Sequence, residues 1–262
     1  MLNSEYFKEY ESVSENIKFI TNSKIRLKIL ATLYNKPSAM KDIHLSTSLS
    51  YSSISSNISK LEEKKLVYRE SNIYFLNNDI KLYLMFILDF NKSLLFINEF
   101  SSLFMKHNIS NFPRDLLNQL YLLEDSELIE SSKNDIYRPY DTIKNILNKE
   151  SNLKIVLPFY YHNLINSISS AVENNNSVEI ILSKNIASNF KENSLNNNVK
   201  CFKVEENSCF SLFLSNKSMA LGLFKKEGSY DQNRILYSEN KNSLIWAENL
   251  FNNTLLKNSL NP

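Results

Sequence analysis

Glycine is nearly absent from this sequence of 262 residues, which contains only Gly222 and Gly228. Loops that wrap a phosphate need several glycines, because only glycine lets the backbone turn so tightly and approach so closely. The sequence therefore excludes phosphate-binding loops of the Walker type and glycine-rich dinucleotide-binding loops.

Cysteine and histidine are also scarce. The two cysteines, Cys201 and Cys209, can neither build a disulfide-rich scaffold nor supply four ligands to a zinc ion. The three histidines lack the spacing of an HExxH zinc motif, and no GxSxG nucleophile motif is present. We expect no metal, no cofactor and no catalytic residue. The cysteines are expected on neighbouring strands as a buried reduced pair, with a redox switch as the alternative.

Long hydrophobic runs are missing as well. The most apolar stretch, Leu82 to Ile97, is interrupted by Asp89, Asn91 and Lys92, and falls short of the roughly 20 apolar residues that span a bilayer. The first 17 residues are acidic and lack the apolar segment of a secretory signal. We therefore expect a cytoplasmic protein without a membrane partner.

The formal net charge of +2 conceals an uneven distribution. Residues 18–69 contain eight Lys and two Arg against three acidic residues, whereas residues 1–17 and 70–262 are both net acidic. A compact basic segment in a nearly neutral chain is typical of a protein that binds a polyanion. A solvated basic surface is the alternative explanation.

The basic segment has the pattern of three short helices followed by a hairpin. Apolar residues follow helical spacing from Ser23 to Tyr34, from Met40 to Thr47 and from Ser53 to Lys65. The period then changes to two, which predicts two short strands around a turn at Ser71-Asn72. This order of elements is typical of a winged helix-turn-helix domain.

The polar side of the third predicted helix, which Ser52 is suited to cap, has the composition of a DNA-reading surface. Short hydroxyls and an amide can hydrogen-bond base edges in the major groove, and lysines can pair with phosphates. Asn57 is the best candidate for reading adenine, and the hairpin would reach the neighbouring minor groove or backbone. An ordinary exposed helix face is the alternative. The predicted DNA contacts are Tyr51, Ser52, Ser53, Ser56, Asn57, Lys60, Lys64, Arg69, Asn72 and Tyr74.

A continuous segment supports this interpretation. The line LSYSSISSNISKLEEKKLVYRE, which begins at Leu49, resembles the recognition helix and wing of regulators typified by arsenic-responsive and multiple-antibiotic-resistance repressors. In those families the segment ends LeekGLv, and Lys65 stands here at the place of the glycine. A left-handed turn is costlier at Lys than at Gly.

A connecting helix is predicted over residues 81–108. Its stretch from Leu82 to Met105 is apolar nearly all round, so the helix must be buried, either inside the chain or against a partner chain. Winged-helix regulators commonly bind two half-sites as dimers, which favours a homodimer.

Strands and helices alternate in residues 109–262, which predicts an α/β sheet covered on its faces. The predicted strands are Leu153–Pro158, Val178–Leu182, Val199–Val204, Cys209–Leu214, Ser218–Phe224 and Arg234–Ser238. The predicted helices are Arg114–Leu123, Tyr140–Asn148, Tyr161–Val172, Ile186–Lys191 and Ser243–Leu256.

The carboxyl ends of the predicted strands could bind a small molecule, as they do in open α/β sheets. The candidate ligand-binding residues are Phe159, Tyr160, His162, Ser183 and Lys184. Simple aromatic packing is the alternative explanation for the aromatic residues among them.

Three C-terminal segments carry a family resemblance: Leu221–Phe224, Gly228–Asp231 and Trp246–Phe251. With the order of elements, they resemble the effector domain of an archaeal winged-helix family named for regulators of methanogenesis and filament formation. The resemblance extends over residues 20–256 and implies a transcription factor. The layout is also similar to phospholipase D-like domains, but His162 lacks the lysine of their catalytic His-x-Lys pair.

The sequence thus predicts a mixed α+β and α/β chain with a winged helix-turn-helix domain at 1–80, a connecting or dimerising helix at 81–108 and a non-catalytic α/β effector domain at 109–262. The predicted function is sequence-specific binding of double-stranded DNA by a homodimer, controlled by a small molecule or partner. The alternatives are a phospholipase D-like hydrolase and a winged-helix module that binds protein.

Overall fold

The computed structural model describes residues 15, 17–110, 112–173, 177–187, 199–204 and 208–259. The chain divides into two compact units, Met1–Leu88 and Asp89–Pro262, and the dividing point falls within helix α5 (Asn78–Glu99). The N-terminal unit has one hydrophobic core, and the C-terminal unit has a core on each face of its sheet.

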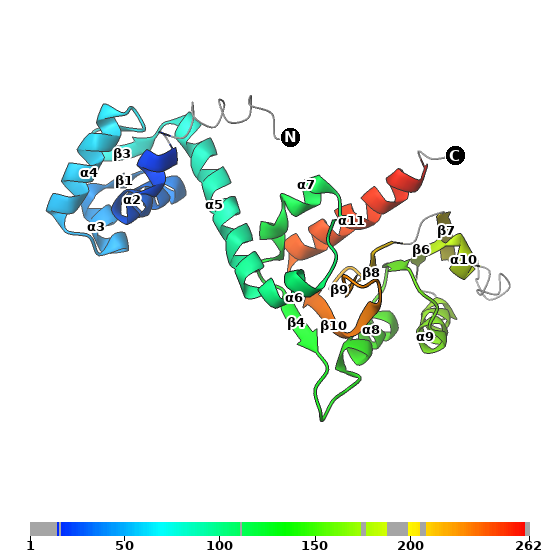
Figure 1. The fold of residues 1–262 in the computed structure, drawn as a ribbon. Coiled ribbons are helices and arrows are strands. Elements are labelled where there is room, and N and C mark those ends of the chain that lie inside the picture. Colours follow the sequence, from blue (N-terminus) through cyan, green and yellow to red (C-terminus); the bar gives the residue numbers. More distant parts are fainter. Residues whose placement is uncertain are drawn as a thin grey trace, which may run out of the picture. The chain divides into compact units, whose positions relative to one another are not determined.

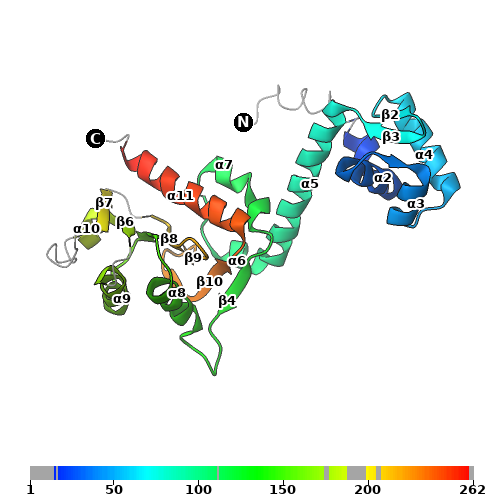
Figure 2. The same ribbon diagram turned by 180° about the vertical axis from the view of Figure 1, so that it is seen from behind.

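The N-terminal unit contains the predicted three helices and hairpin. Its helices are α2 (Lys24–Asn35), α3 (Met40–Thr47) and α4 (Tyr51–Glu63). Its strands are β1 (Ser38–Ala39), β2 (Val67–Glu70) and β3 (Ile73–Leu76), which pair antiparallel in the order β1-β3-β2. The two-residue strand β1 was not predicted, whereas β2 and β3 form the predicted wing (Figure 2).

Left-handed backbone occurs at both turns that flank strand β2. Lys65, which stands in place of a glycine, has a φ of 56°, so the turn after α4 is made despite the side chain. Ser71 and Asn72 have φ values of 48° and 69°, which is the geometry of a two-residue turn that matches the twist of a hairpin. The predicted position of the wing turn is therefore confirmed.

Helix α4 begins two residues earlier than the sequence predicted. Its N-cap is Ser50, whose Oγ accepts a hydrogen bond from the backbone N–H of Ser53 at 3.2 Å. The prediction that Ser52 caps this helix is wrong, because either serine can supply the capping oxygen and Ser50 is the one with extended backbone.

The C-terminal unit is built on a seven-stranded sheet in the order β4-β10-β9-β8-β5-β6-β7. Its strands are β4 (Glu127–Glu130), β5 (Leu153–Leu157), β6 (Val178–Ser183), β7 (Val199–Val204), β8 (Phe210–Leu214), β9 (Met219–Phe224) and β10 (Tyr230–Ser238). Strands β5, β6 and β7 are parallel and all other pairings are antiparallel. The sheet is therefore mixed, and its edge strand β4 was not predicted.

Helices cover both faces of this sheet (Figure 1). On one face lie α8 (Arg138–Lys149), α9 (His162–Glu173) and α10 (Lys184–Ala187), and on the other lie α6 (Ser101–Lys106), α7 (Arg114–Leu117), the 3-10 helix η1 (Leu120–Leu123) and α11 (Lys241–Ser259). One helix was predicted over Arg114–Leu123, where the structure has α7 and η1. The predicted helix Ile186–Lys191 lies mostly outside the described residues.

The two cysteines are not neighbours in the sheet. Cys201 lies on β7 and Cys209 directly precedes β8, and strands β5 and β6 separate these two strands. Cys201 packs against the core under α8 and α9, whereas Cys209 packs against the opposite core. The predicted cysteine pair is therefore wrong, because the order of strands in the sheet differs from their order in the chain.

The predicted connecting helix is two helices, α5 and α6, which meet at Phe100. Seven large apolar side chains of α5 are exposed, with Phe86 at 65% and Phe90 at 64% the most accessible. The single chain therefore does not bury this segment, and of the two expected alternatives only burial against a partner chain stays a prediction. The exposed residues are Leu82, Tyr83, Phe86, Phe90, Leu94, Leu95 and Ile97.

Candidate nucleic-acid interface

Helix α4 has one apolar side and one hydroxyl-rich side. Ile54, Ile58 and Leu61 are at most 2% exposed and fix the helix against the core of the N-terminal unit. On the opposite side Ser52, Ser56 and Ser59 follow a spacing of four and three residues, so they share one face, and all three are exposed. A helix held this rigidly can approach another surface closely at Ser52, Ser56 and Ser59, because these three exposed side chains are short.

The N-terminal end of α4 is organised by an aromatic stack. The ring of Tyr51 stacks on that of His44 with centroids 4.5 Å apart, and Nδ1 of His44 lies 2.6 Å from the carbonyl oxygen of Leu49. Because a carbonyl oxygen only accepts, Nδ1 is the donor and the imidazole is fixed in orientation. Tyr51 remains 49% exposed and can reach a ligand.

Two predicted base-reading residues lie at the edge of the exposed face. Asn57 is half-buried and donates a hydrogen bond from Nδ2 to the carbonyl oxygen of Ser53 at 2.8 Å, and Ser53 is also half-buried. Ser55 and Ser59 are more exposed than either residue and were not predicted. Their signal was present in the sequence, since both lie away from the Ile54, Ile58 stripe.

The two predicted phosphate-binding lysines differ in their surroundings. Lys60 is exposed and forms no ion pair among the described residues. Lys64 is exposed too, but its Nζ lies 5.6 Å from the ring centroid of Phe19. The guanidinium of Arg26 covers the same ring at 4.3 Å, so Phe19 gathers two positive charges beside the end of α4.

The wing presents one basic side chain and hides an aromatic one. The guanidinium of Arg69 donates to the amide oxygen of Asn72 across the turn, and both residues are exposed. Tyr74 is only 5% exposed and belongs to the core, so its prediction as a DNA contact is wrong. The segment Ile73–Leu76 contains no charged residue, and alternation alone did not reveal which side faces inward.

The basic charge of the N-terminal unit is not neutralised locally. Within the described residues, none of the ten Lys and Arg side chains between positions 18 and 69 lies within 4 Å of a carboxylate oxygen. Residues 18–69, with ten basic against three acidic side chains, therefore retain a net positive charge.

The predicted ligand residues at the strand ends have unequal surroundings. Phe159 packs on Tyr230 with ring centroids 4.3 Å apart, while Tyr160 and His162 are exposed. Ser183 is 3% exposed, and its Oγ has no hydrogen-bond partner in the described structure. Lys184 is exposed and follows it in α10. The aromatic-packing explanation fits Phe159. The hydroxyl of Ser183 could form a hydrogen bond with a ligand.

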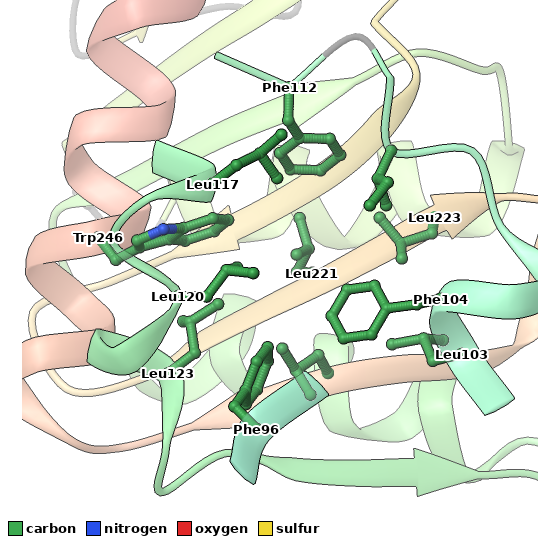
Figure 3. A pocket seen from close by; sticks show the side chains of 12 residues that line it. Phe96, Leu103, Phe104, Phe112, Leu117, Leu120, Leu123, Leu221, Leu223 and Trp246 are labelled. Carbon is green, nitrogen blue, oxygen red and sulfur yellow. The ribbon is translucent and has the colours of Figure 1, made fainter. Parts of the chain in front are cut away.

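A second site in the C-terminal unit is apolar (Figure 3). One cavity of about 20 Å³ is lined by Phe, Leu, Ile and Trp side chains alone. Among those that point toward it are Phe96, Phe104, Phe112, Leu221 and Trp246. Apolar cavities that bind a ring as small as benzene are several times larger, about 150 Å³. This cavity is a packing defect between the sheet and its helices rather than a preformed ligand site.

Metal-binding and membrane-spanning features are not found in the described part of the chain. Its residues contain no group of three or more His, Cys, Asp or Glu side chains arranged to hold a metal ion. None of its helices combines the length and apolar character needed to cross a membrane.

Two family models match this chain. Methanogenesis regulatory protein FilR1, N-terminal domain, matches residues 14–89, and the middle domain of the same protein matches residues 136–256. Methanogenesis regulatory protein FilR1 of Methanothrix harundinacea is 18% identical over an alignment of 162 residues, and the alignment covers 56% of this chain. The match spans only 36% of that relative's length.

Two solved structures show distant likenesses. TrmBL2, an archaeal chromatin protein described as showing a novel mode of DNA binding, aligns over 94% of this chain and 96% of its own, with 14% identity and a TM-score of 0.40. Nuc, a phospholipase D family member from Salmonella typhimurium, aligns over 52% of this chain and 95% of its own, with 11% identity and a TM-score of 0.37.

Proposed function

Because the chain belongs to the family of methanogenesis regulatory protein FilR1, we propose that it is a transcriptional regulator that binds double-stranded DNA through helix α4. The observation that carries this proposal is the exposed hydroxyl face of α4, which lies opposite a buried apolar stripe within the basic segment 18–69. It acts in the cytoplasm as a homodimer, and its C-terminal unit responds to an effector.

Helix α4 enters the major groove with its hydroxyl face toward the bases. Ser52, Ser56 and Ser59 are short enough to bring the helix backbone close to the base edges, and hydroxyls both donate and accept. Ser53 and Asn57 lie beside this face and contact the bases at its margin. Specificity comes from these contacts, while the charged residues supply most of the affinity.

Phosphate contacts flank the reading face on both sides. Lys60 and Lys64 near the end of α4 pair with one strand, and Tyr51 contacts a phosphate at the helix start, where unpaired N–H groups favour an anion. The hairpin adds Arg69, which Asn72 holds in place, at the neighbouring minor groove.

Replacing Lys60 and Lys64 with alanine tests the phosphate contacts. The slope of log K against log salt concentration should become shallower by about 0.9 for each phosphate that is no longer neutralised, because fewer counterions are released from the duplex. The loss of affinity should be the same for specific and random duplexes. Fluorescence anisotropy over a series of salt concentrations measures both quantities.

Lys28→Ala is the matched control, because Lys28 is an exposed lysine of α2 in the same basic segment. It should leave the slope unchanged. If the double variant keeps the wild-type slope, Lys60 and Lys64 do not contact phosphates.

Helix α5 supplies the dimer contact. Tyr83, Phe90 and Ile97 are seven residues apart and exposed, and Phe86 and Leu94 lie three and four residues from members of this series. Apolar residues that repeat every seven positions form the seam along which two identical helices pack. A second copy presents the same seam, so the contact is self-complementary.

Phe90→Lys should convert the dimer to a monomer, because it places a charge in the middle of this seam. Sedimentation equilibrium should give twice the mass of the chain for the wild type and the mass of one chain for the variant. Ile245→Lys is the control, since Ile245 is a 54% exposed apolar residue of α11 that lies outside the seam. A wild-type monomer, or a Phe90→Lys variant that still dimerises, would show that α5 does not form the dimer contact.

A further inference from the structure

A basic groove lies in the C-terminal unit, lined by residues other than the strand-end candidates. It has a volume of about 460 Å³, within the range of sites that bind small molecules. Its lining residues are Lys106, Lys225, Lys226, Glu227, Asp231, Asn233 and Arg234. Four of the seven are basic, and they come from the end of α6 and from the hairpin β9–β10.

Most of this positive charge has no acidic partner among the residues that the structure describes. In the described part of the chain, no carboxylate lies within 4 Å of Lys106, Lys225 or Lys226. Arg234 does pair with Glu130, at 2.8 Å, and holds its guanidinium on the groove wall. Three ammonium groups around one concave site repel one another, and an anion bound between them offsets this repulsion.

The two acidic residues of the groove do not neutralise the three lysines. Asp231 is 4% exposed, and both oxygens of its carboxylate have a hydrogen-bonding partner. Oδ2 lies 3.0 Å from Nε2 of His107, and Oδ1 accepts a hydrogen bond from the backbone N–H of Asn233 at 3.1 Å. Glu227 is exposed and accepts a hydrogen bond from Ser229.

The backbone around the groove is fixed by short-range pairing. His107 and Lys225 form an antiparallel bridge, and the N–H of Lys226 donates to the carbonyl oxygen of Lys106 at 3.0 Å. His107 itself is 1% exposed, with Nδ1 2.7 Å from the carbonyl oxygen of Leu103. The lysines therefore project from a rigid frame, which lowers the entropy lost when a ligand binds.

We infer that this groove binds a small phosphorylated molecule, whose phosphoryl oxygens Lys106, Lys225 and Lys226 hold. Ammonium groups bind phosphate as point charges, and the amide of Asn233 adds a neutral donor for the remainder of the ligand. The ligand links the end of α6 to the β9–β10 hairpin. Binding does not depend on DNA, whereas a role as the effector site of a regulator rests on the function proposed above.

Pyrophosphate is the probe for this site, and isothermal titration calorimetry of the full chain at constant ionic strength measures its binding. The wild type should bind with saturation at one site per chain. Lys225→Gln combined with Lys226→Gln should weaken binding at least tenfold. Lys217→Gln combined with Lys241→Gln, at two exposed lysines of the same unit, is the control and should bind as the wild type does.

Three outcomes would overturn the inference. In the first, the wild type does not bind pyrophosphate with saturation. In the second, both double variants lose binding equally, which would show that general charge attraction causes the binding. In the third, the Lys225 and Lys226 variant binds pyrophosphate normally but loses affinity for duplex DNA, which makes the groove a DNA contact. The fluorescence of Trp246, the only tryptophan, verifies that each variant is folded. All pyrophosphate titrations omit DNA, so failure of the proposed DNA binding does not affect their result.

Discussion

Replacing Gly222 with alanine is expected to lower the free energy of unfolding of the C-terminal unit by about 3 kcal/mol, as overpacking of a core does. A Cβ atom at this position would overlap the hydroxyl of Tyr230 and would lie 2.6 Å from Oγ of Ser211. These two hydroxyls are hydrogen-bonded to each other at 2.7 Å, so the new methyl group would also break a partly buried hydrogen bond.

The Tyr230 side chain cannot move aside to make room. Its ring is held by Phe159 at 4.3 Å and by Phe224 at 5.4 Å between centroids. Burial raises the pKa of Tyr230 to about 12, so the hydroxyl stays protonated at neutral pH. The close approach of this ring is the physical reason for one of the two glycines of the chain.

Urea titration followed by the fluorescence of Trp246 measures the effect, because this buried side chain reports on the C-terminal unit. Gly228→Ala is the matched control. Gly228 has a φ of +93°, and a Cβ atom there would meet nothing within 4 Å, so only backbone strain of about 1 kcal/mol is expected. Equal losses in the two variants would contradict the overlap with Tyr230 as the cause.

Ser56→Glu is expected to lower the affinity for duplex DNA at least 100-fold. The substitution places a negative charge in the centre of the hydroxyl face, where it would meet the charge of the phosphates and would lose its hydration in the groove. A like-charge contact of this kind costs several kcal/mol. Electrophoretic mobility shift with the upstream region of the gene measures the change.

Loss of folding cannot produce this result. Ser56 is exposed, Glu is a better helix former than Ser, and Lys60 lies four residues further along the same helix. Ser102→Glu adds the same charge to an exposed position of α6 and should leave the affinity unchanged. If both variants bind equally weakly, the effect is one of total charge and not of the α4 surface.

The winged-helix part of the chain was predictable because its signals are local. The helical spacing of Ile54, Ile58 and Leu61 fixes the inward side of α4, and the Ser71-Asn72 turn fixes the wing. The exposed residues on the outward side of α4 were predicted only in part. Ser55 and Ser59 were not predicted, although both lie away from the apolar stripe and are exposed, because a serine gives a weaker chemical signal than an amide or a lysine.

The C-terminal part was predictable in its elements but not in their arrangement. The order of strands in the sheet depends on pairings distant in the chain, so the separation of Cys201 from Cys209 could not be inferred from spacing. The buried pair of His107 and Asp231 joins residues 124 positions apart, and no local sequence pattern predicts this contact. The same holds for the groove that these residues support.

Site-specific photocrosslinking tests most directly whether the hydroxyl face of α4 lies against DNA. A benzoylphenylalanine placed at Ser56 or Ser59 should crosslink to duplex DNA, whereas the same group at Lys28 of α2 or at Ser131 should not. Crosslinking from Lys28 with none from Ser56 or Ser59 would contradict the account, because another surface would then face the duplex.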